Sequence, residues 1–294
     1  MDDHDAHANS FGPAAATYER GRPPYPAAAL DWLLEPAGEQ APPGAARGLP
    51  NQTGAGPSSG ADSVRPGQVS SSGAAQRLSD AGERRPGQAR MAPRVLDLGA
   101  GTGKLTRQLV ERGLEVIAVD PSDGMLGELG RVLPGTPALA GTAEGIPLPD
   151  HSVDVVLVAQ AWHWVDPARA VPEVARVLSP GGRLGLIWNL RDEREDWVRQ
   201  LGEIMTSPEL RRTSTLGPPF GPAQRRDFPW THRIPRDRLF DLVASRSAAI
   251  LLAPDERAAL LARVRDLLDT HPDLAGRNEI DMPDITECAR ADLS

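Results

Sequence analysis

The sequence VLDLGAGTG, residues 95–103, decides the fold of this chain. Four apolar or acidic residues are followed by three glycines in alternate positions, and an amphipathic stretch begins directly after them. Glycine permits backbone angles that a side chain forbids, and it lets a ligand approach the main chain closely. The pattern predicts a buried strand, a tight turn and a helix, with a ligand at the carboxyl end of the strand.

Working outward, apolar and amphipathic stretches alternate on both sides of this turn. The apolar runs lack the alternation of half-exposed strands, which is typical of parallel strands buried on both faces. They are RVLDLG (94–99), EVIAVD (115–120), PALAG (137–141), VDVVLVAQ (153–160) and RLGLIWN (183–189). We expect helices at Lys104–Arg112, Ser122–Leu133 and Pro172–Leu178, the last beginning with its proline. Repeated strand–helix units predict a doubly wound α/β sheet.

The C-terminal third predicts edge strands and further helices. Residues Arg225–Ile234 and Glu279–Ala289 are strand-like and could form a hairpin on the sheet edge. Two amphipathic helical faces accompany them, one carrying Trp197, Leu201 and Ile204 and the other Leu261, Val264 and Leu268.

Glycine and proline, which interrupt helices and strands, are concentrated in residues 37–92. This segment contains no aromatic residue and no isoleucine. Such a segment cannot bury enough apolar area to offset its ordering entropy, so we expect a disordered insertion. Residues 1–36 precede this insertion, and we expect a short helix in them at Ala27–Leu34. Residues 93–191 form the cofactor-binding core, and residues 192–294 complete the same domain with edge strands and substrate-side helices.

Composition excludes several classes of protein. The formal net charge of -8 provides no general cationic field for nucleic acid or an anionic membrane. Cys288 is the only cysteine, which rules out a disulfide framework and suits a reducing compartment. The acidic N-terminus MDDHDAHANS is unlike a signal peptide, and we expect a cytoplasmic protein. The histidines have no convincing metal-ligand spacing, so no metal site is expected.

Two aspartates suggest which ligand the turn binds. Asp97 precedes the glycines, and Asp120 ends the next strand, where a carboxylate can accept both hydroxyl protons of a ribose. Asp97 would repel a phosphate, whereas the ammonium and sulfonium of S-adenosylmethionine favour a nearby carboxylate. The order G-x-G-x-G also differs from the dinucleotide pattern G-x-G-x-x-G. Each aspartate could instead be a capping or turn residue.

The chain resembles a known family in five segments taken in order: DLGAGTGKLT, AVDPSDGML, GTAEGIPLPD, SVDVVLVAQAWHWVDP and EVARVLSPGGRLGLIWN. It is similar to class I S-adenosylmethionine-dependent methyltransferases of the methyltransferase domain 11 type, among them small-molecule enzymes like trans-aconitate methyltransferase. The resemblance implies a Rossmann-like seven-stranded sheet whose last strand is antiparallel. It also implies that the donor lies across the ends of the first two strands.

Carried over by position, the resemblance implies that the glycine turn lines the methionine part, with Asp97 near its ammonium. Asp120 would hold the ribose, Met125 would pack on the adenine, and Ala143 and Glu144 would lie beside the adenine edge. The full donor set is Asp97, Gly99, Ala100, Gly101, Gly103, Asp120, Met125, Thr142, Ala143, Glu144 and Gln160. Thr142 stands where many relatives have an aspartate. The contact that a carboxylate makes to the adenine amine in those relatives would here be made by a hydroxyl or be lost.

The acceptor side is expected after the fourth core strand, where Trp162, His163 and Trp164 could supply aromatic walls and one titratable group. The plain alternative is that both tryptophans pack under the next helix. The resemblance also implies that residues 1–36 fold back as an N-terminal lid, in which Tyr18 and Arg22 could meet the donor's carboxylate or an acidic substrate. The alternative is an ordinary proline-rich entry segment.

The expected activity is methyl transfer to a small molecule by in-line displacement. Nucleic acid is disfavoured as an acceptor because the Asn-Pro-Pro-aromatic signature is absent after the fourth core strand. The alternatives are a catalytically weak S-adenosylmethionine-binding module and a nicotinamide-dependent oxidoreductase. A monomer and a homodimer both remain open.

Overall fold

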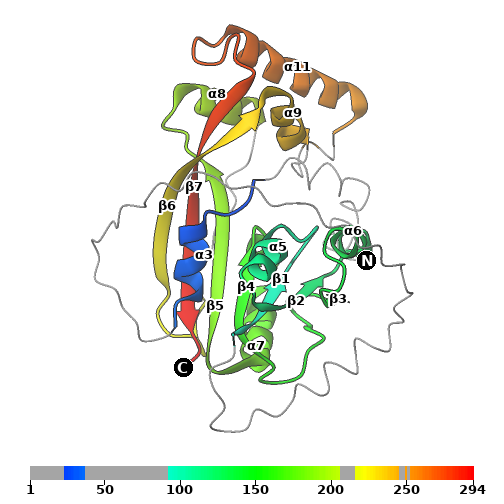
Figure 1. Ribbon diagram of the computed structural model, residues 1–294, viewed down its shortest axis with the longest axis vertical. Helices are drawn as coiled ribbons and strands as arrows, with labels where there is room; N and C mark the ends of the chain where they lie inside the picture. Colours follow the sequence, from blue (N-terminus) through cyan, green and yellow to red (C-terminus); the bar gives the residue numbers. More distant parts are fainter. Residues whose placement is uncertain (1–22, 37–91, 206–215, 245–248, 250–251) are drawn as a thin grey trace, which may run out of the picture.

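The computed structural model describes residues 23–36, 92–205, 216–244, 249 and 252–294. A core lobe contains the main sheet, and a smaller C-terminal lobe sits beyond the ends of its strands (Figure 1). Residues 37–91 of the predicted insertion and residues 1–22 of the predicted lid lie outside the described residues. Within the described residues no helix is both long and apolar enough to span a bilayer.

The elements alternate as the sequence pattern predicts. The strands are β1 (Arg94–Leu98), β2 (Glu115–Asp120), β3 (Ala138–Ala140), β4 (Val153–Ala159), β5 (Leu178–Arg191), β6 (Gln224–Pro235) and β7 (Glu279–Asp292). The helices are α3 (Ala27–Leu34), α5 (Lys104–Glu111), α6 (Asp123–Val132), the 3-10 turn η2 (Trp162–Trp164), α7 (Pro167–Val177), α8 (Asp196–Met205), α9 (Arg236–Ala244) and α11 (Pro254–Thr270).

The sheet has the strand order β3-β2-β1-β4-β5-β7-β6. The pairs from β3 to β5 are all parallel, and β7 lies antiparallel between β5 and β6. The order reverses at β1, which is where open α/β sheets bind ligands beyond the strands' carboxyl ends. The predicted doubly wound seven-stranded sheet with an antiparallel last strand is confirmed.

The two faces of the core sheet are covered by different helices. One apolar cluster joins Leu30 and Leu33 of α3 to Leu105 and Leu109 of α5, while α7 packs in a second cluster on the other face. Along each of these strands, successive apolar residues belong alternately to one cluster and to the other, because the side chains of a strand point to opposite faces of the sheet. Both faces of β1 and β4 are therefore buried, which explains their continuous apolar sequence.

One predicted helix begins in the wrong place. The prediction opened it at Pro172, but α7 begins at Pro167, and Pro172 lies inside it. Asp166 caps this earlier start, with its Oδ1 accepting the amide of Ala168 at 3.0 Å. An aspartate followed by proline is a strong helix start, and it prevails over the helix-opening preference of Pro172.

The strands β6 and β7 carry the C-terminal lobe away from the core. Pairing between β5 and β7 ends where Arg191 faces Asp284, but β6 and β7 stay paired as far as Pro235 and Glu279. Around this extension the helices α8, α9 and α11 bury a separate apolar cluster. The predicted hairpin and the two predicted helical faces meet in this lobe (Figure 1).

Two buried arginines hold the C-terminal end of α3 against the sheet. Arg290 donates to the carbonyl of Trp32, Arg183 donates to the carbonyl of Glu35, and the Arg290 guanidinium lies 4.2 Å from the centre of the Trp32 ring. Cations are favourable at a helix C-terminus because the last carbonyls lack partners. The opposite end of α3 is thereby directed toward the carboxyl edge of the sheet.

Candidate functional site

The glycine turn after β1 has the backbone that its sequence predicts. Gly99, Gly101 and Gly103 have φ values of 75°, 56° and 88°, in the region that favours glycine. A methyl group at Gly99 would also lie 2.7 Å from Cβ of Ala161, whereas one at Gly101 would meet no atom of the described residues within 4 Å. The amides of Gly99 and Ala100 both donate to the carbonyl of Val119, at 2.8 and 3.1 Å. The turn is thus fixed to β2 and leaves open space beside Gly101.

Asp120, at the end of β2, faces this turn. Its Oδ2 accepts the amide of Gly101 at 2.8 Å, and its Oδ1 accepts the amide of Ser122 at 2.9 Å. Burial raises the pKa of this carboxyl, and the two amide donors oppose that shift. Each oxygen accepts one hydrogen bond here and can accept another, so the carboxylate keeps capacity for two ribose hydroxyls.

Asp97 is fully buried behind the glycine turn. Its Oδ2 accepts the hydroxyl of Thr106 at 2.6 Å, while its Oδ1 has no hydrogen-bond partner among the described residues. Burial raises its pKa to about 7, and the negative charge of Asp120 adds to this. A cation bound at the turn would stabilise the ionised form. The orphaned oxygen therefore fits a cationic ligand, although the carboxyl has no exposed surface of its own.

Four further predicted donor residues lie in helix α6 and in the loop after β3. Met125 is buried in α6, with its amide directed at the Ser122 hydroxyl. Thr142 is exposed and bridges to Gly145, and Ala143 is buried. The side chain of Glu144 is held in place, because its Oε1 accepts the amide of Asp166 at 2.9 Å. Glu144 thus connects the predicted adenine loop to the segment that follows β4.

The segment after β4 begins with a conformational outlier. Gln160 has a φ of 58°, which is uncommon outside glycine and tends to occur at functional sites. Its Nε2 donates to the carbonyl of Asn189 at 3.1 Å and thereby bridges the ends of β4 and β5. This side chain therefore borders the region between the predicted donor site and the carboxyl end of β5.

The three residues predicted for the acceptor side separate by burial. Trp162 is 2% exposed and belongs to the core cluster, whereas Trp164 is 37% exposed. The ring of His163 lies 4.8 Å from that of Trp164, at an interplanar angle of 47°. Trp162 therefore packs in the core, as the alternative interpretation of the sequence predicted for it. His163 and Trp164 form an aromatic pair nearer the surface.

Asn189 is a site residue that the sequence analysis did not single out. It ends the apolar part of β5, and its Nδ2 donates to the carbonyl of Pro24 at 3.0 Å. Its Oδ1 accepts the hydroxyl of Thr286 at 2.6 Å. The chain before α3 therefore crosses the carboxyl edge of the sheet beside Gln160, whereas Tyr18 and Arg22 lie outside the described residues. A polar residue ending an apolar strand was the available signal.

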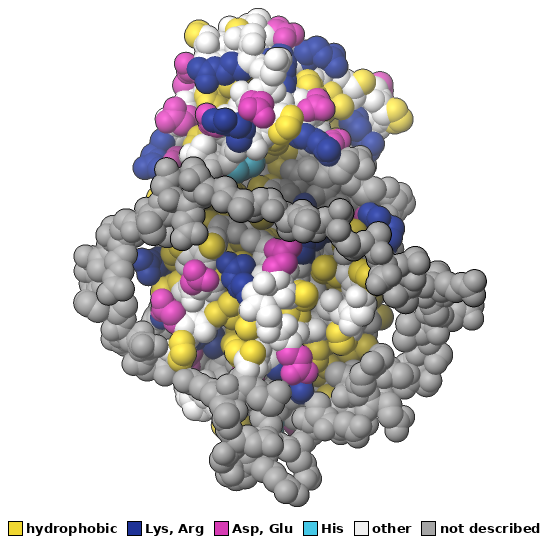
Figure 2. Space-filling view, viewed as in Figure 1, with side chains coloured by type: hydrophobic (Ala, Val, Ile, Leu, Met, Phe, Trp, Pro, Cys, Tyr) yellow, Lys and Arg dark blue, Asp and Glu magenta, His cyan; other side chains and the backbone are white. Residues whose placement is uncertain are grey.

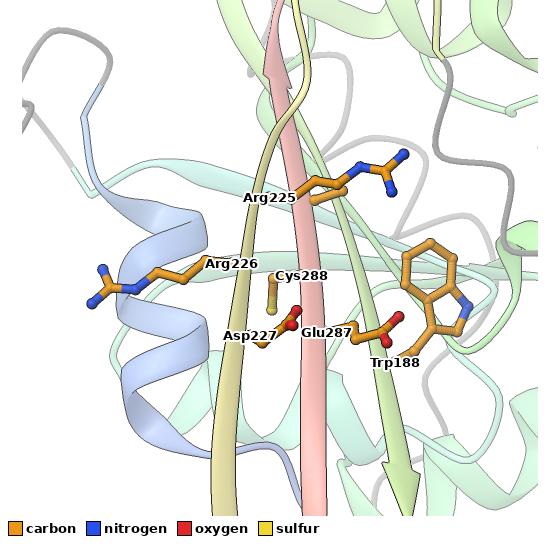
Figure 3. Close-up of a pocket in the computed structure, with 7 residues that line it drawn as sticks. Trp188, Arg225, Arg226, Asp227, Glu287 and Cys288 are labelled. Atoms are coloured by element: carbon orange, nitrogen blue, oxygen red, sulfur yellow. The ribbon is translucent and has the colours of Figure 1, made fainter. Parts of the chain in front are cut away.

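A pocket of about 290 Å³ lies elsewhere, on strands β5, β6 and β7. Trp188, Arg225 and Glu287 are among its lining residues, and Arg225 and Arg226 point to opposite sides of the ribbon (Figure 3). None of the predicted donor residues that the structure describes lines it. No group of three or more His, Cys, Asp or Glu side chains with metal-binding geometry occurs among the described residues.

Comparisons with known proteins agree with this geometry. Residues 96–186 match the model of the methyltransferase domain family. The chain is 50% identical over 287 residues to an uncharacterized methyltransferase of Mycobacterium tuberculosis, covering 97% of this chain and 96% of that protein. An uncharacterized methyltransferase-like protein of Schizosaccharomyces pombe is 34% identical over 196 residues, covering 63% and 77% of the two chains.

A similar solved structure is that of a putative type II methyltransferase from Anaeromyxobacter dehalogenans. It has a TM-score of 0.52 and 25% sequence identity, and the match covers 74% of this chain and 93% of that one. The chain belongs to the class I S-adenosylmethionine-dependent methyltransferases. It is therefore an enzyme whose methyl donor is S-adenosylmethionine, and the nicotinamide-dependent alternative is wrong.

Proposed function

We propose that this methyltransferase transfers the methyl group to a small-molecule acceptor that enters beside the ends of β4 and β5. One observation carries the proposal: the 2.8 Å hydrogen bond between Gly101 and Asp120 joins the two predicted halves of the donor site in one crevice. The open space beside Gly101 and the orphaned oxygen of Asp97 support a cationic nucleoside there.

The roles of the donor residues follow from their chemistry. Asp120 would accept the ribose hydroxyls, while Gly99, Ala100, Gly101 and Gly103 would face the methionine part. Asp97 would supply a negative charge behind the turn, and Met125, Thr142, Ala143 and Glu144 would border the adenine. Bound S-adenosylmethionine supplies a methyl carbon that is already strongly electrophilic. The protein consequently needs to position the acceptor and exclude water rather than form a covalent intermediate.

The acceptor region combines Gln160, His163 and Trp164. The indole and imidazole pair offers an aromatic surface, and the imidazole can orient or deprotonate an acidic group of the acceptor. In the transfer, the bond from sulfur to the methyl carbon breaks and the bond to the acceptor atom forms. S-adenosylhomocysteine leaves, and a proton of the acceptor passes to a base or to water.

A small acceptor is also favoured by the surface. Lys/Arg and Asp/Glu side chains are interspersed over the C-terminal lobe on the face in Figure 2, so the described residues of this face present no continuous cationic track for a phosphate backbone. The net charge of -8 has the same implication.

Calorimetry with S-adenosylmethionine tests the donor site. Asp120→Asn removes charge-assisted hydrogen bonds worth about 1.5–3 kcal/mol, so the dissociation constant should rise by roughly ten-fold or more. Asp123→Asn, on an exposed neighbouring carboxylate, is the matched control and should bind as the wild type does. Equal affinity of wild type and Asp120→Asn would defeat the proposed site.

Turnover separates an active enzyme from a weak binding module. Release of S-adenosylhomocysteine would be measured with a panel of small carboxylic acids and phenols. Conversion with any of them supports the small-molecule proposal. Donor binding with no turnover across a broad panel would favour the binding module instead.

A further inference from the structure

The helix α7 begins with a backbone amide that its own first turn cannot satisfy. Asp166 is the N-cap of α7, and its Oδ1 accepts the amide of Ala168 at 3.0 Å. In a capping box, the amide of the N-cap residue donates to a Glu or Gln side chain three positions later. That position holds Arg169, whose guanidinium only donates. The amide of Asp166 therefore needs an acceptor from elsewhere in the fold.

Glu144 supplies this acceptor from the loop after β3. Its Oε1 accepts the amide of Asp166 at 2.9 Å, across 22 positions of the sequence. A carboxylate is also favourable at a helix N-terminus, where the first amides lack partners within the helix. Glu144 thus completes the cap of α7 from a different loop, a role that the sequence analysis did not give to it.

Glu144 shares a tight turn with a residue of the proposed adenine site. The amide of Gly145 donates to the carbonyl of Thr142 at 3.2 Å, so Ala143 and Glu144 are the two central residues of one turn. Ala143 is buried, and Glu144 is half-buried. Because so short a turn has few conformations, a ligand that holds Ala143 also fixes the direction of the Glu144 side chain.

The cap lies at one end of the segment that carries the proposed acceptor residues. This segment, residues 161–166, begins against the glycine turn, because a methyl group at Gly99 would lie 2.7 Å from Cβ of Ala161. Trp162 fixes its middle in the core, and its last amide is the one that Glu144 accepts. Both ends of the acceptor segment are therefore attached to parts of the proposed donor site.

His163 and Trp164 lie between these attachments, in the 3-10 turn η2. The amide of Trp164 donates to the carbonyl of Ala161 at 3.0 Å. The amide of Val165 donates to the carbonyl of Trp162 at 3.3 Å. A single 3-10 turn has only these few bonds of its own, and their geometry is poorer than that of an α-helix. The position of the aromatic pair therefore depends on how the two ends of the segment are held.

We propose that Glu144 is a positioning residue that transmits occupancy of the donor site to the acceptor residues His163 and Trp164. A donor bound against Ala143 holds the turn, the turn directs Glu144 at the amide of Asp166, and the completed cap fixes the end of the acceptor segment. The acceptor therefore binds more tightly after the donor, and by linkage the donor binds more tightly beside an acceptor. This inference rests on the proposed function, since it connects the two halves of the same site.

Hydrogen exchange of the amides of Trp164 and Val165, resolved by NMR on the full chain, tests this connection without an acceptor. Both amides donate to backbone carbonyls, which no side-chain variant removes. The probe is S-adenosylhomocysteine at saturation, with its affinity for each variant measured by calorimetry. It should slow the exchange of both amides in the wild type by about five-fold, which corresponds to one hydrogen bond of about 1 kcal/mol.

Three variants of Glu144 separate its hydrogen bond from its charge and its size. Glu144→Met has similar length but no acceptor oxygen, so the slowing should fall below about two-fold. Glu144→Asp keeps the charge but is too short to reach the amide of Asp166, so it should behave like Glu144→Met and gives the same comparison if that variant does not fold. Glu144→Gln keeps an acceptor oxygen at the same reach and should retain most of the slowing.

The matched control is Glu115→Met. It also removes a hydrogen-bonded carboxylate, 2.8 Å from Nε of Arg94, but at the start of β2, away from the carboxyl edge of the sheet. The slowing in this variant should equal that in the wild type.

The outcomes separate this inference from the proposed function. Failure of the wild type to bind S-adenosylhomocysteine defeats the donor site. Binding without slower exchange of the two amides overturns the role of Glu144 and leaves the donor site intact. Equal slowing in the wild type, Glu144→Met and Glu144→Asp also overturns this role, as does an equal loss of slowing in Glu115→Met.

Discussion

The buried carboxyl of Asp97 leads to a sharp prediction about pH. Its pKa is about 7 in the folded protein and 3.8 for an ordinary aspartate, mainly because burial removes the charged form from water. Since the folded pKa is the higher one, this group stabilises the fold fully below pH 4, and the contribution is lost as pH rises through 7. Each pH unit between the two values is worth about 1.4 kcal/mol, so the total loss is on the order of 4 kcal/mol.

The perturbation is Asp97→Asn, which has nearly the same shape and cannot ionise. Its carbonyl oxygen can still accept the hydroxyl of Thr106, as Oδ2 does in the wild type. Of the total loss, about 2–3 kcal/mol falls between pH 5 and pH 8. In the absence of donor, the free energy of unfolding of the variant relative to the wild type should therefore be about 2–3 kcal/mol higher at pH 8 than at pH 5.

Urea unfolding of the donor-free proteins near pH 5 and pH 8 measures this difference. Glu111→Gln, on an exposed carboxylate at the end of α5, is the matched control and should show no such gain. S-adenosylmethionine should bind the wild type more tightly above pH 7, where Asp97 is ionised, and Asp97→Asn should lose this pH dependence. A constant stability difference between variant and wild type at both pH values would refute the reasoning.

Three further predictions concern stability and reactivity. Gly99→Ala should destabilise the protein by about 2–3 kcal/mol in urea unfolding, because it combines a positive φ with a 2.7 Å contact to Ala161, whereas Gly127→Ala in α6 should be neutral or stabilising. Native Cys288 should resist a thiol reagent at pH 8 and react after unfolding, since burial raises its pKa to about 12; fast native labelling would contradict this. Arg290→Met should lower the free energy of unfolding by about 2 kcal/mol, because it leaves the carbonyl of Trp32 without its donor. The control Arg131→Met, at an exposed arginine, should lower it by less than about 0.5 kcal/mol. Similar losses for both variants would contradict the anchoring of α3.

Local patterns were sufficient for the core of the fold. The apolar runs predicted β1 to β5 because parallel strands buried on both faces require them. The alternate glycines predicted a turn that the structure bears out with three positive φ values. The start of α7 was missed because two prolines competed for it, and the cap at Asp166 decided between them.

The candidate site was predictable only in part. Asp120 and Gly101 stand at the ends of adjacent strands, so chain order alone indicated that they meet, and they do at 2.8 Å. The burial difference between Trp162 and Trp164 was not predictable, since both are tryptophans two residues apart. It depends on which side of the 3-10 turn packs against the core.

The sequence by itself determined the sheet, the glycine turn and the family, because these depend on residue order, strand burial and backbone angles within short segments. Only the tertiary structure decided which distant residues meet. Arg183 and Arg290 bind carbonyls at the end of α3 that are 148 and 258 positions away in the sequence. The physical reason is that such contacts arise from the register of paired strands and the packing of a helix on them, which no local pattern encodes.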